Sequence, residues 1–274
     1  MKDGNAKDRV ILIVGASSGI GLEAARLFAR EGYIVYGASR RGCPLAVPGA
    51  KGALHALVMD VSNEQSIKNG VQAAIKEQGH IDILLYAAGN GLSGPAELAS
   101  KEHAQAQLDV NFYGALSLIN AVTPHMRERR SGLLLFVGSV GGIFPVPYQL
   151  LYSASKAALS IYVEGLRLEL KPFCVHACIV EPGDVKTAFT DARRPIGCIP
   201  PYEEAMNRAV SRMERDERNG MSPSIVAKAL LRAAKRKSPP ARMTVGAQYR
   251  FFVGLKRVLP RRLVEWLLYK MYLG

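Results

Sequence analysis

The sequence contains no apolar run long enough to cross a membrane. Its longest purely apolar stretches are short, such as "LLLFV" at 133–137, against the roughly 18 residues that a spanning helix needs. The opening residues, "MKDGNAKDRV", have no apolar core, so we expect no secretory signal. Apolar residues nevertheless make up 49% of the 274 positions, which is too many for a disordered chain. A chain of this length can bury the core of one large domain or two small ones.

Cysteine is also scarce. The chain has Cys43, Cys174, Cys178 and Cys198, and none of them forms a CxxC pair. Cys174 and Cys178 flank His176 in or beside an apolar run, where buried thiols are more common than metal ligands. We therefore expect these two thiols to be buried, no metal site, and a reducing, cytoplasmic environment.

Acidic residues are almost absent from one end of the chain. Residues 228–274 carry twelve lysines and arginines and a single acid, Glu265, so they hold most of the net charge of +13. The rest of the chain is nearly neutral. This distribution argues against a protein built around nucleic acid and predicts at most a local contact with an anionic partner.

What the sequence does contain is a regular alternation of strand-like and helical patterns. Strands are expected at 9–15, 33–39, 54–60, 81–89, 132–139, 175–183 and 242–246. Helices are expected at 21–32, from the capping-box pair Ser62 and Gln65 to about 78, at roughly 100–128, at 151–171, and at 223–236 behind Ser222 and Pro223. Near-continuous apolar strands between helices predict an α/β fold, a doubly wound parallel seven-stranded sheet with helices on both faces. We expect one domain over 1–246 and a C-terminal extension over 247–274.

The first strand runs into a glycine-rich loop, "GASSGIG" at 15–21. Glycines let the backbone approach a pyrophosphate, and the N-terminus of the next helix directs N–H groups at it. The alternative is a glycine-rich turn that only packs the strand against the helix. We favour nucleotide binding, with contacts from Gly15, Ser17, Ser18, Gly19, Ile20 and Gly21.

The second strand ends in "ASRR", where an NAD site usually places a carboxylate for the ribose 2′-hydroxyl. Here Ser39 takes that place, and Arg40 and Arg41 follow. A guanidinium pairs with a 2′-phosphate through charge-assisted hydrogen bonds worth roughly 1.5–3 kcal/mol. The sequence therefore favours NADP(H), although a solvated arginine pair on a surface loop is the alternative.

Further motifs stand in a fixed order. They are "DV" at 60–61, "AAG" at 87–89, "NFYG" at 111–114, Ser139 in "VGSVGG", "YSASK" at 152–156 and "EPGDVKT" at 181–187. Together with the glycine-rich loop, they resemble the short-chain dehydrogenase/reductase family over residues 9 to 246. Ser139 also precedes Tyr152 by the spacing that the family uses. The chain departs from the family pattern at two places: Val14 stands in place of a threonine, and "YAAG" stands in place of Asn-Asn-Ala-Gly. In the family, these residues mainly support the nucleotide site through hydrogen bonds.

The resemblance implies a Rossmann-type fold and a catalytic set of Asn111, Ser139, Tyr152 and Lys156. Reducing a ketone requires a hydride on carbon and a proton on oxygen. A tyrosine supplies that proton well if its pKa approaches neutrality, which requires about 4 kcal/mol of stabilisation of the phenolate. Residues i and i+4 share a helix face, so Lys156 can place its cation near Tyr152. Asn111 resembles the asparagine that orders a water in the proton relay, and Ser139 resembles the serine that binds the substrate oxygen.

The resemblance also completes the cofactor site. Asp60 and Val61 would flank the adenine, although Asp60 can equally be a helix-start residue only. The nicotinamide end would meet Pro182, Gly183 and Thr187. The full expected set beyond the glycine-rich loop and "ASRR" is Asp60, Val61, Ala88, Gly89, Tyr152, Lys156, Pro182, Gly183, Val185 and Thr187.

Residues 188–221 are expected to form a substrate lid. The apolar residues of the lid include Phe189, Ile196, Ile199, Pro200, Pro201 and Tyr202. They favour a lipophilic carbonyl or alcohol as the substrate. The alternative is that they only pack the lid on its own domain. The chain looks most like the hydroxysteroid and retinol branch of the family. This implies an oxidoreductase acting on a steroid-, retinoid- or acyl-like substrate, in a homodimer or homotetramer. The alternative is an NADP(H)-binding sensor without turnover, against which the complete catalytic set speaks.

The extension, 247–274, is divided by Pro260 into two short helical pieces that are apolar and basic. We expect its apolar face to close the substrate pocket or a contact between subunits. The alternative is a weak, peripheral contact with an anionic membrane surface.

Overall fold

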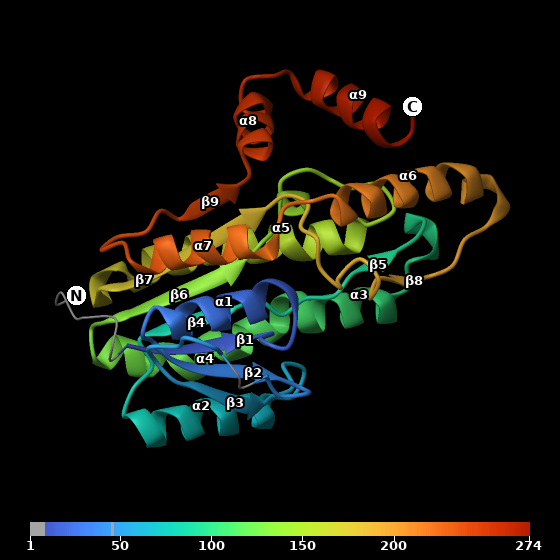
Figure 1. The fold of residues 1–274 in the computed structure, drawn as a ribbon. Coiled ribbons are helices and arrows are strands. Elements are labelled where there is room, and N and C mark those ends of the chain that lie inside the picture. The colour runs from blue at the N-terminus through green and yellow to red at the C-terminus, as the bar shows by residue number, and fades with distance from the viewer. Residues whose placement is uncertain (1–8, 45–46) are drawn as a thin grey trace.

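The computed structural model describes residues 9–44 and 47–274, and a parallel sheet of seven strands forms its centre (Figure 1). The strand order is β3-β2-β1-β4-β6-β7-β9. The strands are β1 (Val10–Val14), β2 (Ile34–Ser39), β3 (Leu54–Val58), β4 (Ile83–Tyr86), β6 (Gly132–Val137), β7 (Val175–Pro182) and β9 (Arg242–Val245). This arrangement confirms the predicted fold class.

Helices cover both faces of the sheet. One face packs against α2 (Glu64–Gln78), α4 (Gly114–Glu128) and α5 (Leu150–Leu170), and the other packs against α1 (Gly19–Arg30) and α7 (Pro223–Ala234). Successive residues of a strand point to opposite faces. In β1, Leu12 therefore joins the core under α4 and α5, and Ile13 joins the core under α1 and α7.

The helix starts test the capping predictions. Helix α7 begins as predicted, because Ser222 accepts a hydrogen bond from the Ser224 N–H at 3.3 Å and Pro223 follows it. The predicted start of α2 is wrong by one residue. Its cap is Asn63, whose side chain accepts from the Ser66 N–H at 2.9 Å. Ser62 instead belongs to the turn before the helix.

The helical stretch expected at 100–128 is present but irregular. It runs through α3 (Lys101–Leu108), a π-helical turn (Asp109–Tyr113) and α4. A π turn holds one more residue than a regular turn and is often found at functional sites.

Two further features differ from the sequence prediction. A second sheet, made of β5 (Leu92–Ser93) and β8 (Arg194–Pro195), ties the start of the lid to the loop after β4. Its strands are too short to give a periodic pattern. The expected burial of Cys174 is wrong, although Cys178 is buried. Cys174 lies in the turn just before β7, with a φ of 56°, and its thiol is exposed.

The lid and the extension lie together above the sheet (Figure 1). The lid contains α6 (Pro200–Arg218), and the extension contains α8 (Ala247–Lys256) and α9 (Arg261–Tyr272), which Pro260 separates as predicted. Helix α9 packs against α6. Among the described residues, no helix combines the length and apolar character needed to cross a membrane.

Candidate active site

The predicted site residues lie at the carboxyl edge of the sheet. The strand order reverses direction between β1 and β4, and ligands of doubly wound sheets bind at such a switch point. The loops after β1, β4, β6 and β7 carry the glycine-rich loop, "AAG", Ser139 and "PGDVKT". The first turn of α5 brings Tyr152 to the same edge.

Tyr152 is half-buried in this edge, and its ring centroid lies 5.5 Å from that of Phe189 in the lid. Burial raises the pKa of Tyr152 to about 12, and a hydrogen bond with the Ser139 side chain acts in the opposite direction. We expected Lys156 to bring this pKa toward neutrality, but burial of the phenol dominates. The protein alone therefore keeps Tyr152 protonated at neutral pH, the state that a proton donor needs.

Lys156 is almost completely buried behind Tyr152. Its Nζ donates to the backbone carbonyl of Val137 at 3.0 Å and lies 5.9 Å from the centroid of the Tyr152 ring. Burial disfavours the cation and lowers the pKa of Lys156 to about 8. Lys156 is thus a cation at neutral pH that loses its proton in mildly alkaline solution.

Ser139 lies at the end of β6 in extended conformation. Its hydroxyl accepts a hydrogen bond from the Gly141 N–H at 3.0 Å, which starts a short 3-10 turn. This bond and the hydrogen bond to Tyr152 fix the direction of the hydroxyl beside the phenol.

Asn111 is fully buried in the π turn, and every polar atom of its side chain is used. Its Oδ1 accepts from the Asn90 N–H at 2.9 Å, and its Nδ2 donates to the Ser155 hydroxyl at 2.9 Å. Ser155 in turn donates to the Tyr152 carbonyl at 2.7 Å. A hydrogen-bonded chain therefore connects the π turn to the helix that carries Tyr152 and Lys156.

Two supporting residues carried no signal in the sequence. Gln107 is fully buried, and its side chain bonds the Leu92 N–H at 2.9 Å and the Asn90 carbonyl at 2.8 Å. Asn90 follows the "AAG" loop, so these two residues hold that loop against the π turn. Their role depends on contacts between distant segments, which spacing in the sequence does not reveal.

The glycine-rich loop packs closely on its neighbours. Gly15 has a φ of 89°, and a Cβ there would lie 2.7 Å from the backbone nitrogen of Ala88. A Cβ on Gly21 would lie 2.2 Å from the Gly15 carbonyl oxygen. Both positions therefore require glycine. The alternative interpretation, a glycine-rich turn that only packs the strand against the helix, predicts the same requirement.

The first turn of α1 fits an anionic ligand as well. It contains no acidic residue, and Ser18 at its cap makes no capping hydrogen bond with its side chain. The free N–H groups of this turn and its partial positive charge suit a pyrophosphate. Thr187 lies across from it, 3.3 Å from where a Cβ of Gly19 would stand. Ser17 and Ile20 belong to the same loop, and Val185 lies on the opposite side with Thr187.

The catalytic candidates lie close to the loop after β4 at Gly89. A Cβ there would lie 3.4 Å from Asn111 Oδ1 and 3.6 Å from Lys156 Nζ. The structure thus brings the four catalytic candidates and the loops after β1, β4 and β7 into one region.

The loop after β2 folds back on itself. The Ser39 hydroxyl donates to the Gly42 carbonyl at 2.5 Å and accepts from the Arg41 N–H at 3.2 Å. Arg40 and Arg41 are exposed at this turn. The glycine-rich loop lies next to the end of β2, because the Gly15 and Ala16 N–H groups donate to the Ala38 carbonyl at 2.8 and 3.1 Å.

Asp60 and Val61 lie after β3. Asp60 accepts from the Ser62 N–H at 2.9 Å, and its own N–H donates to the Ser66 hydroxyl at 3.0 Å. These bonds correspond to the helix-start role. Val61 packs against Gly114, where a Cβ would lie 2.9 Å from the Val61 Cβ.

A buried ion pair lies beside Tyr152 in the segment 188–221, which we expected to form the lid. The side chain of Arg193 is 2% exposed and contacts Glu217 of α6 at 2.5 Å, and Glu217 also accepts from the Thr190 hydroxyl at 2.7 Å. Gln149, at the cap of α5, directs its amide oxygen at the guanidinium and accepts a hydrogen bond from Arg193. The lid is therefore fixed to the helix that carries Tyr152. Sequence reasoning missed this cluster because its members are distant in an arginine-rich segment.

The extension contacts two loops of the site. Tyr249 of α8 covers Gly183, and its hydroxyl donates to the carboxylate of Asp184. The Lys256 ammonium donates to the Ile143 carbonyl in the loop between Ser139 and Tyr152. The extension therefore lies against the loops after β6 and β7, and the expectation that its apolar face closes the substrate pocket or a contact between subunits stays a prediction.

The fold and this arrangement define an oxidoreductase with a nicotinamide dinucleotide site. The chain belongs to the short-chain dehydrogenase/reductase family, because the family model described as "short chain dehydrogenase" matches residues 9–195.

Individual relatives place it in the hydroxysteroid- and retinol-dehydrogenase-like branch. It is 38% identical to a 3-ketodihydrosphingosine reductase from Bacteroides thetaiotaomicron, over 96% of this chain and 98% of the relative. It is 33% identical to retinol dehydrogenase 8 from Bos taurus, over 92% and 86% of the two chains. A solved structure titled as the closed form of serine dehydrogenase complexed with NADP+ superposes with a TM-score of 0.72, at 26% identity over 86% of this chain and 94% of that chain.

Proposed function

We propose that the protein is an NADP(H)-dependent reductase of a ketone on a lipophilic substrate, with an acyl- or alkyl-chain ketone favoured over a steroid or retinoid. The observation that carries this proposal is the placement of Tyr152 beside Ser139 and the buried Lys156, at the carboxyl edge of the sheet. The preference for a chain-like substrate is supported by the nearly full-length similarity to a 3-ketodihydrosphingosine reductase.

The residues divide the proton chemistry among them. The nicotinamide dinucleotide, when bound, supplies the hydride that the carbonyl carbon receives. Ser139 binds the carbonyl oxygen, and Tyr152 gives its proton to that oxygen as negative charge develops there. Lys156 then stabilises the phenolate that remains, since its pKa of about 8 keeps it cationic at neutral pH. Asn111 positions Tyr152 through Ser155.

A preference for NADP(H) follows from the loop after β2. Arg40 and Arg41 are exposed cations, and the turn at Ser39 offers no carboxylate that would repel a 2′-phosphate. The rest of the proposed cofactor contacts are Gly15, Ser17, Ser18, Gly19, Ile20, Gly21, Asp60, Val61, Ala88, Gly89, Pro182, Gly183, Val185 and Thr187.

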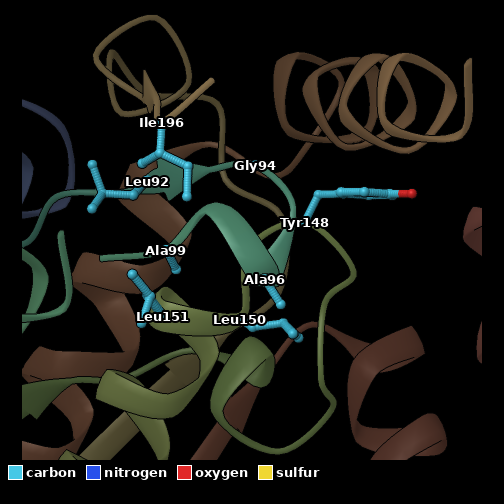
Figure 2. Close-up of a pocket in the computed structure, with 8 residues that line it drawn as sticks. All are labelled: Leu92, Gly94, Ala96, Ala99, Tyr148, Leu150, Leu151 and Ile196. Carbon is cyan, nitrogen blue, oxygen red and sulfur yellow. The ribbon is translucent and has the colours of Figure 1, made fainter. Parts of the chain in front are cut away.

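A small cavity beside α5 suits part of an apolar substrate. A cavity of about 110 Å³ lies beside the start of α5, where Leu92 and Ile196 face Leu150 and Leu151 (Figure 2). Leu151 directly precedes Tyr152 in the sequence. This cavity supports a site for part of an apolar chain, because its lining is almost wholly hydrocarbon.

A contact between identical subunits belongs to the same proposal. The outer face of α5 exposes an apolar stripe at helical spacing, in which Ile161 is 68% and Leu168 is 72% exposed. Burying this stripe against its copy would form a two-fold dimer contact. Analytical ultracentrifugation of wild type and Ile161→Arg tests it, and a wild-type monomer would contradict it.

The activity is tested by following NADPH absorbance with long-chain ketones, steroid ketones and retinal, each against NADH. We expect turnover of at least one long-chain ketone, faster with NADPH. Tight NADPH binding without turnover of any lipophilic carbonyl would instead support the sensor alternative.

A further inference from the structure

Helix α9 carries two apolar stripes, and only one of them is covered. Val264, Leu268 and Tyr272 are partly buried on the side that packs against the lid helix α6, where burial raises the pKa of Tyr272 to about 12. Leu263, Trp266 and Leu267 repeat at i, i+3 and i+4 on another side and are 41%, 55% and 39% exposed. We call this second set the outer stripe. Covering the lid therefore does not account for it.

The extension exposes further apolar side chains together with several basic ones. The other large apolar side chains exposed on the extension are Phe251, Val258, Tyr269 and Met271, at 64%, 76%, 56% and 36%. Between them stand the exposed basic residues Arg250, Arg257, Arg261, Arg262 and Lys270. Glu265 is the only acid of this segment.

The charge decides which partner this surface fits. A two-fold contact with a second copy would bring like-charged arginines together, because such contacts pair the same patch with itself. An anionic lipid surface removes that conflict, since each basic residue near it adds about 1 kcal/mol of attraction. Trp and Tyr beside arginines also match the amphipathic boundary of a bilayer.

We propose that α8 and α9 dock the protein on an anionic lipid surface through the outer stripe and its flanking arginines. The twelve residues of α9 lie along the surface rather than across it, because they are far too few to span a bilayer. This inference goes beyond the reductase activity, since docking requires neither cofactor nor turnover.

The contacts of the extension give this docking a direction. Tyr249 holds α8 to Asp184 after β7, and Lys256 holds it to Ile143, with its ammonium 5.0 Å from the centroid of the Phe144 ring. Helix α9 lies on the lid helix α6. The docked face is therefore the face that carries the lid, so a lipophilic substrate reaches the lid directly from the bilayer.

Trp266 provides a direct probe, because it is the single tryptophan of the chain. We would titrate the full-length protein with phosphatidylcholine vesicles that do or do not contain phosphatidylglycerol, and record both co-sedimentation and Trp266 emission. We expect sedimentation and a blue shift with the anionic vesicles at low salt, and neither with the neutral ones. High salt should reverse both signals.

Two variants and two controls locate the surface. Replacing the outer stripe, Leu263→Ser with Trp266→Ser and Leu267→Ser, should weaken vesicle binding at least tenfold. Arg261→Glu with Arg262→Glu should weaken it about 30-fold or more, since each lost cation removes about 1 kcal/mol of attraction. Val58→Ser, at an exposed apolar position on the distant edge strand β3, and Arg127→Glu, at the end of α4, should bind as wild type does.

Three results would overturn the proposal. The first is no sedimentation with anionic vesicles at low salt. The second is sedimentation without a change in Trp266 emission, which would place binding on another surface. The third is a concentration-dependent blue shift in the absence of lipid, which would identify a second copy as the partner. A failure of ketone reduction in solution leaves these readouts unchanged, so the two proposals fail separately.

Discussion

Replacing Lys156 with methionine is expected to stabilise the folded protein while removing its activity. Methionine matches the length and apolar stem of lysine, but it carries no charge into the core. Burial lowers the pKa of Lys156 from 10.5 to about 8, which corresponds to about 3 kcal/mol of cost for keeping the cation folded at pH 7. The Val137 carbonyl loses its donor in the variant, at a cost of about 1 kcal/mol. The expected net gain at pH 7 is about 2 kcal/mol.

The pH dependence distinguishes this explanation from a simple packing effect. The unfolded chain binds the proton of Lys156 more tightly than the folded chain does, so folding releases it between pH 8 and pH 10.5. The stability of the wild type relative to the variant therefore rises with pH across this window. By pH 9.5 the cost of the buried cation falls to about 1 kcal/mol, and the two proteins should be nearly equally stable.

Urea unfolding of both proteins without cofactor, followed by circular dichroism at pH 7 and pH 9.5, measures the effect. Lys76→Met, at an exposed position on α2, is the matched control and should show no pH-dependent difference from wild type. A Lys156→Met protein that is no more stable than wild type at pH 7, or whose advantage is the same at both pH values, would refute the reasoning.

Three other changes test the remaining parts of the site. Tyr152→Phe should reduce turnover at least about a hundredfold and leave NADPH affinity nearly unchanged, as measured by initial rates and by fluorescence titration; a milder loss would mean that Tyr152 is not the acid. Arg40→Asp should shift the ratio of kcat/KM for NADPH and NADH toward NADH, and an unchanged ratio would place the 2′-phosphate elsewhere. Glu217→Gln should lower the free energy of unfolding by up to about 3 kcal/mol, because it removes the close carboxylate of the buried Arg193 guanidinium and leaves only Glu214, at 4.0 Å, as its acidic partner. Glu204→Gln, on the exposed side of the same helix, should be close to neutral in the same urea titration.

The sequence was sufficient for the sheet and for the placement of Tyr152 and Lys156. Buried parallel strands give apolar runs that need no knowledge of their neighbours, and a spacing of four on a helix fixes a shared face. It was insufficient where two polar residues compete, as at Ser62 and Asn63, because only the local backbone decides which of them caps α2. It was also insufficient for Arg193, whose burial depends on a partner at the far end of α6.

The extension shows the same division. Pro260 predicts the break between α8 and α9 from its chemistry alone. Which of the apolar residues of α9 are covered is a different question, because it depends on where α6 lies. Sequence reasoning treated them as one face, whereas the structure separates Leu268 on the inner side from Trp266 on the outer side.

The π turn at Asp109–Tyr113 fits one extra residue into a single turn between α3 and α4. Each residue of a regular helix advances the direction of the side chain by about 100°. Deleting one residue from this turn would leave a regular turn with the same net rotation, so Leu118 and Val122 would stay in the core, but the side chain of Asn111 would no longer be directed at Ser155. Substitutions at the exposed Tyr113 are tolerable by comparison. The extra residue therefore serves the direction of Asn111 rather than the packing of α4, and in a library of single-residue deletions across 101–128 those within the turn should retain the most folded protein while losing turnover.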